Sequence, residues 1–303
     1  MNTILLFLAT LLLLIIIWDF FFTVLSISGA GFVSSMISAL ISTVFLKLSR
    51  FLKNREVLNY SGVSVILSLI IWWIGGLWLG FLLLLVSDSD SVVNTSTHEM
   101  ASLSDKFYYS GYVLSTMGNG DFKPGSSTWQ IVIAFFPFSG FIFITTAMTY
   151  LISVSSAVIF KRSLAHSITD IMVLDNYDDR INCLYENTDN IRNRINQHNQ
   201  NHLAYPVVHY FYSLDKKASF SVGLWELNAM LTSLQNDPTQ PLNKLKPLNQ
   251  AIDNYLSSMG EAFIPKVQSN SENEGEDSVK KRRTQLHNLL KSDGWHLNQI
   301  EMD

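Results

Sequence analysis

Residues 108–124 read YYSGYVLSTMGNGDFKP, a short amphipathic stretch that ends in a turn around Gly118 and Gly120. The two glycines interrupt a helix, because glycine favours backbone angles that are closed to other residues. Glycines at alternating positions also let successive carbonyls point the same way. Non-helical backbone at membrane depth is tolerated only where it is buried in protein or lines a water-filled path. If this segment enters a membrane, its carbonyls need a partner, and a desolvated cation is a suitable one.

Long apolar stretches surround this segment. A helix needs roughly 20 apolar residues to cross a bilayer core, because only a helix or closed barrel satisfies its backbone polar groups internally. Four stretches meet this requirement, namely 5–25, 31–48, 61–87 and 125–160. Of the 46 charged residues (21 basic and 25 acidic), 13 lie in residues 1–160 and 33 in residues 161–303. We therefore predict an all-α membrane protein with four transmembrane helices, a re-entrant helix and a polar, helical C-terminal domain.

The basic residues set the expected orientation, because they gather on the cytoplasmic side of membrane proteins. Two groups follow the second and fourth apolar stretches: Lys47, Arg50, Lys53 and Arg55, then Lys161 and Arg162. Both places are expected to be cytoplasmic, in a multi-pass protein of the plasma (cell inner) membrane. The segment between the third and fourth stretches then faces outward. Besides Asp121, its charged residues are Asp88, Asp90, Glu99, Asp105, Lys106 and Lys123. An acidic vestibule of this kind would raise the local cation concentration.

Asp19 interrupts the first apolar stretch. A charge inside a membrane is costly, and such residues are functional by default. We favour a milder interpretation, in which Asp19 lies near the end of its helix and reaches the interface. A secretory signal peptide is the less favoured interpretation of this stretch, because no basic residue precedes it.

Several kinds of site and partner are not expected. A net charge of -4 without a long basic run argues against nucleic acid as a partner. Cys183 is the single cysteine, which excludes an intramolecular disulfide and a thiolate-rich metal site. We interpret His198 and His202, four residues apart, as solvated surface histidines rather than metal ligands. No spacing of Ser, His and Asp forms a catalytic signature, so we predict no enzyme, no catalytic residue and no cofactor.

Residues 108–124 resemble the pore loop of tetrameric potassium channels. Tyr108 and Tyr109 stand where that family has an aromatic pair before its filter. Five further positions carry the residue types of the family's filter and the proline that follows it: Thr116, Gly118, Gly120, Asp121 and Pro124. Gly140 coincides with the hinge glycine of the family's inner helix. The resemblance covers about residues 61–160.

The resemblance implies a filter that replaces the hydration shell of potassium. The implied ion-binding set is Thr116, with its carbonyl and hydroxyl, Met117, Gly118, Asn119 and Gly120. The implied supports of the filter are Tyr108, Tyr109, Tyr112 and Asp121, with a hydrogen bond from the Tyr112 hydroxyl to Asp121. Asn119 replaces the family's usual tyrosine and fills less volume, so a non-selective monovalent cation channel is the alternative.

One filter loop per chain requires several chains around a pore, and the resemblance implies four identical subunits. Residues 61–87 would form the outer helix and residues 125–160 the inner, pore-lining helix. Pro137 and Gly140 would form a gating hinge, since proline removes a helical hydrogen bond and glycine adds freedom. Phe141, Ile144 and Met148 share one helical face and would line the pore, although packing against neighbours fits their spacing equally well.

We therefore expect a transmembrane hairpin (1–56), a pore domain (57–160) and a cytoplasmic helical domain (161–303) with a flexible linker near 266–279. Beyond residue 160, apolar residues recur every three or four positions, as in amphipathic helices. The basic cluster at residues 280–283 is expected to be solvated. The predicted function is a potassium channel whose partners are potassium ions, the lipid bilayer and identical subunits. The alternative from another class is a membrane-anchored sensor or scaffold with a vestigial pore loop.

Overall fold

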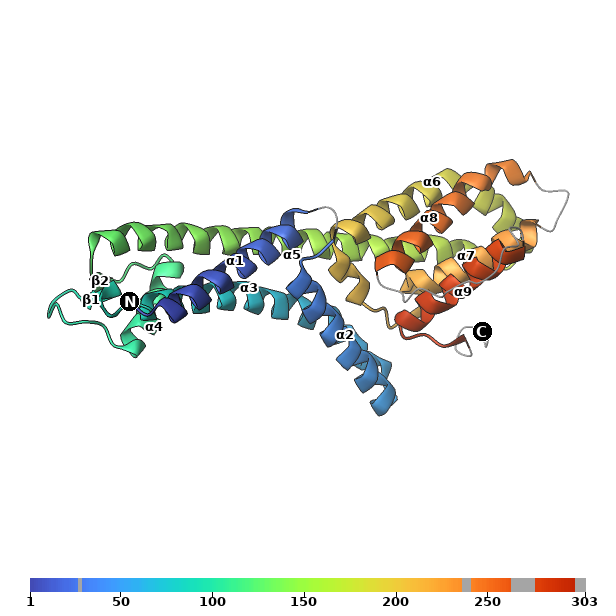
Figure 1. Cartoon of the computed structure of the whole chain (residues 1–303). Coiled ribbons are helices and arrows are strands. Elements are labelled where there is room, and N and C mark those ends of the chain that lie inside the picture. Colours follow the sequence, from blue (N-terminus) through green and yellow to red (C-terminus); the bar gives the residue numbers. More distant parts are fainter. Residues whose placement is uncertain (27–28, 236–240, 263–275, 298–303) are drawn as a thin grey trace. The chain divides into compact units, whose positions relative to one another are not determined.

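The structure is a computed structural model of the chain, and it describes all residues except 27–28, 236–240, 263–275 and 298–303. Most of the described residues are helical (Figure 1). The α-helices are α1 (Thr3–Leu25), α2 (Phe32–Leu52), α3 (Ser61–Val86), α4 (Leu103–Leu114), α5 (Ser127–Met172), α6 (Tyr177–Ala204), α7 (Phe220–Gln235), α8 (Lys246–Ala262) and α9 (Glu276–Ser292). Strands β1 (Val92–Asn94) and β2 (Phe122–Pro124) form a small antiparallel pair. The predicted all-α class is confirmed.

Among the residues that the structure describes, four helices are long and apolar enough to cross a membrane: α1, α2, α3 together with the 3-10 turn that precedes it, and α5. Each coincides with one of the four apolar stretches of the sequence. The chain is therefore an integral membrane protein. Helix α5 continues 12 residues beyond the uncharged stretch that ends at Phe160, to Met172.

The chain divides into two compact units, one formed by Met1–Leu40 and Ser64–Ser153, the other by Ile41–Val63 and Val154–Asp303. Helices α2, α3 and α5 each contribute to both units. The domain boundaries expected after residues 56 and 160 stay predictions. The linker expected near residues 266–279 lies outside the described residues up to residue 275.

In the first unit, α1 packs closely against α3 (Figure 1). A Cβ atom on Gly76 would lie 2.3 Å from the Ile16 side chain, and one on Gly80 would lie 2.7 Å from that of Leu13. Small residues four positions apart therefore let the two backbones approach, as is common between helices in membranes. The helix α1 also contacts α5, where the rings of Phe20 and Phe143 stack with centroids 4.0 Å apart.

Asp19 does not reach an interface, so our favoured interpretation of this residue is wrong. Its side chain is buried, 2% exposed, at the point where α1, α2 and α3 meet. The carboxyl group accepts hydrogen bonds from the backbone N–H groups of Val33 and Ser34, both at 3.0 Å. The indole N–H groups of Trp72 and Trp73 donate to it as well, at 3.2 and 3.3 Å. Asp19 thus caps the N-terminus of α2 from inside the bundle.

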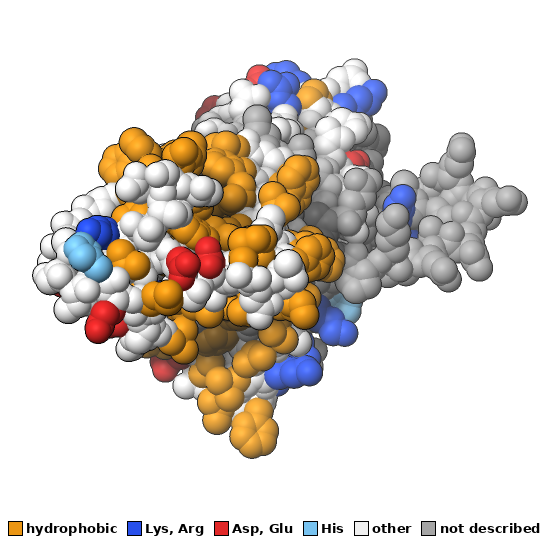
Figure 2. All heavy atoms as spheres, turned by 60° about the vertical axis from the view of Figure 1, so that its left-hand side comes forward, with side chains coloured by type: hydrophobic (Ala, Val, Ile, Leu, Met, Phe, Trp, Pro, Cys, Tyr) orange, Lys and Arg blue, Asp and Glu red, His pale blue; other side chains and the backbone are white. Residues whose placement is uncertain are grey.

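In Figure 2 the helices of the first unit are turned to the viewer, and apolar side chains cover much of their surface. The largest exposed ones in α5 include Phe135, Phe138 and Phe141, which are 61 to 71% exposed in the single chain. Apolar surface of this extent is stable against lipid tails or another subunit, and unstable in water.

The second unit is built around α6, α7, α8 and α9, which share one apolar core. The segment Ile41–Val63 is fastened to it by polar contacts. Ser42 Oγ and the Tyr212 hydroxyl lie 2.7 Å apart, and the Arg55 guanidinium donates to the carbonyls of Ser213, Asp293 and Gly294. Each of these carbonyls would otherwise lose its hydrogen bond to water on burial.

His198 and His202 are not solvated, so our expectation for them is wrong. His198 is 0% exposed and His202 is 1% exposed. The His198 ring packs edge-to-face on Phe220 of α7 and stacks on Tyr255 of α8. The Asn and Gln residues that surround these histidines in the sequence give no indication of their burial. The side chains that cover the histidines belong to helices that follow later in the chain.

Candidate functional site

Helix α4 begins with a capping box. Ser102 Oγ accepts a hydrogen bond from the Asp105 backbone N–H, and the Asp105 carboxylate accepts one from the Ser102 N–H. Reciprocal caps of this kind satisfy two of the free N–H groups at a helix start. With 12 residues, α4 is about 18 Å long, too short to cross a bilayer core.

Lys106, in the first turn of α4, is buried, although it belongs to the charged segment that we expected to face outward. Its side chain is 5% exposed. The ammonium group donates to the carbonyls of Leu85, Asp88 and Ser89, at 3.0, 2.6 and 3.3 Å. A cation is favourable at the C-terminus of a helix, where carbonyls lack intrahelical partners. Lys106 therefore fixes α4 to the C-terminal end of α3.

Helix α4 ends in a left-handed turn at Thr116, whose φ is 59°. The Met117 N–H bonds the Tyr112 carbonyl at 2.9 Å, and the Thr116 N–H bonds the Val113 carbonyl at 3.1 Å. This pair of bonds is the Schellman motif, which usually places glycine at the left-handed position. A β-branched residue there is strained, and such strain clusters at functional sites.

Left-handed angles recur at every second residue of the loop after α4. The φ angles of Thr116, Gly118 and Gly120 are 59°, 62° and 84°, whereas Met117 and Asn119 between them do not have positive φ. Alternation between the two hands turns successive peptide groups the same way, so that carbonyls gather on one side of the chain. All five residues are exposed in the single chain, and Met117 is 70% exposed.

The Asn119 side chain connects this loop to α4. Its Nδ2 group donates to the Tyr108 hydroxyl and, at 2.8 Å, to the Asp121 carboxylate. Two hydrogen bonds therefore hold Asn119 in place, at the position where the resemblance implies an aromatic ring. The structure thus identifies Tyr108 and Asp121 as the hydrogen-bond partners of the Asn119 side chain.

Thr95, which is not among the predicted site residues, holds the end of the loop that leads into β2. Its Oγ1 donates to the Gly120 carbonyl at 2.7 Å, and its backbone N–H donates to the Asp121 carbonyl at 2.9 Å. The pairing of β1 with β2 brings Asn94 opposite Phe122 and so places Thr95 here. No local pattern could reveal this contact, because the two segments are about 25 residues apart.

The other expected support residues lie at the base of the loop. Tyr109 is 3% exposed and packs edge-to-face against Tyr112. The Tyr112 hydroxyl donates to the Phe122 carbonyl at 3.1 Å, so the expected bond to Asp121 is not present. This tyrosine therefore holds the backbone of β2 instead of a carboxylate.

Gly140 lies where α5 passes the C-terminal end of α4. A Cβ atom on Gly140 would lie 2.2 Å from the Leu114 carbonyl oxygen. The residue thus has a packing role in this conformation, and α5 is a continuous helix through Pro137 and Gly140. The role of these two residues as a hinge stays a prediction.

The expected pore-lining residues share the outer face of α5. Phe141, Ile144 and Met148 are 61, 44 and 54% exposed, whereas Phe143 and Ala147 on the opposite face are buried. Ile144 and Met117 also line an apolar pocket of about 450 Å³ between α3, α4 and α5. The loop and the exposed face of α5 therefore lie in the same unit.

We expect Tyr108→Phe to loosen the loop without unfolding α4. The change removes the acceptor of the Asn119 amide, a hydrogen bond worth about 0.5–1.5 kcal/mol. In a pore of the kind that the resemblance implies, the permeability ratio of potassium to sodium should fall about 2- to 10-fold, as measured by reversal potentials under mixed ions. Tyr60→Phe is the matched control, because Tyr60 is 65% exposed. An unchanged ratio in Tyr108→Phe would show that the Asn119 contact does not shape the loop.

Comparison with known proteins gives two matches. A family model described as "Ion channel" matches residues 67–157, from within α3 to within α5, and so includes α4 and the loop after it. A membrane protein of Bacillus subtilis (strain 168), named "Uncharacterized membrane protein YdjJ", is 31% identical over 264 residues, which cover 81% of this chain and 75% of that protein. No solved structure matches the chain.

Proposed function

The chain belongs to the ion channel family, and we infer that it forms a potassium-conducting pore from four identical subunits. The observation that carries this proposal is the alternation of left-handed angles at Thr116, Gly118 and Gly120 in an exposed loop. Backbone carbonyls that face one side can replace the water around a dehydrated cation. The proposed ion sites are the carbonyls of residues 116–120.

Four chains are proposed because one loop supplies only one side of a pore. The apolar face of α5 with Phe141, Ile144 and Met148 is exposed in one chain, which supports its use as a pore wall or subunit contact. The basic residues at the end of α2 and in α5 support a cytoplasmic position for the second unit in this proposal. Conduction of this kind requires no cofactor beyond the permeant ion.

Ion flux into liposomes that contain the purified protein tests the proposal. We expect potassium uptake in the wild type and at least about a tenfold loss in Gly118→Ala, because the left-handed angle of 62° disfavours a side chain. Gly75→Ala is the matched control, since a Cβ atom there meets nothing within 4 Å inside a helix. Equal loss in both variants would contradict the role of Gly118.

A non-selective cation pore is the second candidate, favoured by the small Asn119 side chain in place of an aromatic ring. Reversal potentials with potassium on one side and sodium on the other separate the two. A sensor or scaffold without conduction would show no flux in the folded wild type. A mass of the protein in detergent that does not correspond to four subunits would contradict the proposed assembly.

A further inference from the structure

A polar groove opens between α7, α8 and α9 in the second unit. Its volume is about 800 Å³, within the range of small-molecule sites. Side chains from all three helices line it, and most are amides, hydroxyls or basic groups: Trp225, Asn228, Thr232, Gln235, Gln250, Asp253, Asn254, Ser257, Lys281, Arg282, Arg283 and Gln285. The lining carries three positive charges against one negative charge, which favours an anion.

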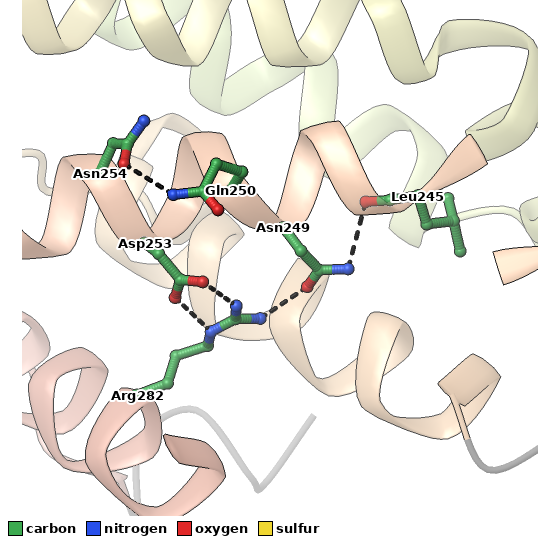
Figure 3. A network of polar contacts seen from close by, with 6 residues as sticks. All are labelled: Leu245, Asn249, Gln250, Asp253, Asn254 and Arg282. Carbon is green, nitrogen blue, oxygen red and sulfur yellow. Dashed lines mark hydrogen bonds and ion pairs between the residues drawn. The ribbon is translucent and has the colours of Figure 1, made fainter. Parts of the chain in front are cut away.

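One of the three cations is already neutralised. The Arg282 guanidinium donates to both oxygens of Asp253, at 2.7 and 2.5 Å, and to Asn249 Oδ1 at 2.6 Å (Figure 3). The bidentate geometry fixes α9 against α8 and so builds one wall of the groove. Arg282 is therefore a structural residue of the groove and has little capacity left for a ligand.

The other two cations remain available. Within the described residues, Lys281 and Arg283 make no ion pair. Both are exposed, and they lie on either side of Arg282 at the edge of the groove. They are two residues apart in α9, so their side chains diverge around the helix. Two unpaired cations spread in this way are suited to an extended group with several anionic oxygens, such as a phosphate chain.

Trp225 gives the groove a flat apolar surface. Its side chain is half-buried, packs on the core of the unit and forms part of the groove lining. The Arg283 guanidinium carbon lies 5.9 Å from the centroid of the Trp225 ring. An indole face of this kind stacks on planar rings. Asn228, one turn further along α7, has a buried Oδ1 without a hydrogen-bond donor in the described part of the chain. A ring amino group of a ligand would satisfy it.

We propose that this groove binds a small anionic ligand with a planar heteroaromatic ring, the chemical class of the nucleotides. The ring stacks on Trp225, the amides of Asn228 and its neighbours bond the edge of the ring, and Lys281 and Arg283 hold the phosphates. Neither a bare anion nor a neutral ring uses all three features. This proposal does not depend on conduction, since it concerns the second unit alone.

The test is equilibrium binding to the full-length protein in detergent at near-physiological salt, where weak surface attraction is screened. The probes are ATP, adenosine as the ring without charge, and pyrophosphate as the charge without ring. ATP should bind at least about tenfold more tightly than either fragment, since charged hydrogen bonds and stacking each contribute. Pyrophosphate binding as tight as ATP, or no ATP binding at millimolar concentration, would overturn the proposal.

Variants place the binding in the groove. Lys281→Gln together with Arg283→Gln should weaken ATP binding about tenfold or more, because two charge-assisted contacts are lost. Lys280→Gln is the matched control, as this exposed lysine of α9 does not line the groove. Trp225→Leu should weaken binding and Trp225→Phe should largely restore it. Equal affinity in the double variant and the control would show that any bound nucleotide lies elsewhere.

Discussion

Asp19→Ala is expected to destabilise the first unit by about 3–5 kcal/mol, the usual consequence of removing one side of a buried polar contact. The change leaves the N–H groups of Val33 and Ser34 without an acceptor. It also frees the indole N–H group of Trp72, and it leaves the indole N–H of Trp73 with Ser34 Oγ as its acceptor. Unpaired donors are especially costly among apolar helices, because no water replaces the lost partner.

The thermal unfolding of the purified protein in detergent measures this effect. The midpoint should fall by roughly 10 °C if each kcal/mol corresponds to a shift of about 2–4 °C. Asp170→Ala is the matched control, since Asp170 is an exposed aspartate of α5. Asp19→Asn keeps one acceptor oxygen but turns an amide donor toward indole donors, so it should lie near Asp19→Ala. A midpoint within 2 °C of the control would contradict the capping role of Asp19.

The contrast between the filter loop and Asp19 shows which features a sequence reveals. The loop could be located because Gly118 and Gly120 act locally, and because the apolar stretches beside it have the length of membrane helices. Asp19 could not be understood from its own stretch, because its donors lie 14 to 54 residues further along the chain. The length of an apolar stretch predicts a membrane helix. It does not predict which residues of another helix pack against a given residue of that helix.

The same reason explains the error at His198 and the unexpected burial of Lys106. Around His198 the sequence is rich in Asn and Gln, which indicates a solvated helix, yet Tyr255 of α8 covers the ring. Lys106 lies in an acidic stretch, which indicates a solvated charge, yet the carbonyls at the end of α3 surround it. Thr95 carries no signal of its own, because a threonine in a polar loop is common.

Acidification is expected to unfold the second unit through three buried histidines. Burial is the main cause that lowers the pKa of His198 to about 3 and that of His209 to about 4, and it holds the pKa of His202 well below its usual 6.5. Lys161 opposes the protonation of all three, whereas Asp293 favours that of His209. The nearby Tyr255 hydroxyl stays neutral, because burial raises its pKa.

The sign of the effect follows from proton uptake. Because the unfolded chain binds protons below about pH 6.5 and the folded chain does not, the three histidines contribute full stability above that pH. Each histidine removes about 1.4 kcal/mol per pH unit below it, so the three together remove about 4 kcal/mol per unit until the folded pKa is reached. A domain stable by about 5–10 kcal/mol, in the lower part of the usual range, would then unfold near pH 4–5.

The single thiol, Cys183, is a probe for this transition. It lies half-buried in α6 against the core that the histidines share, so unfolding exposes it to a disulfide reagent that reacts in acid. His198→Leu should move the midpoint of labelling to lower pH, because it removes a titrating ring whose nitrogens have no hydrogen-bond partner within the described residues. His166→Leu on the exposed face of α5 should leave the midpoint unchanged. If His198→Leu and the wild type expose Cys183 at the same pH, the buried imidazoles do not set the acid limit of this domain.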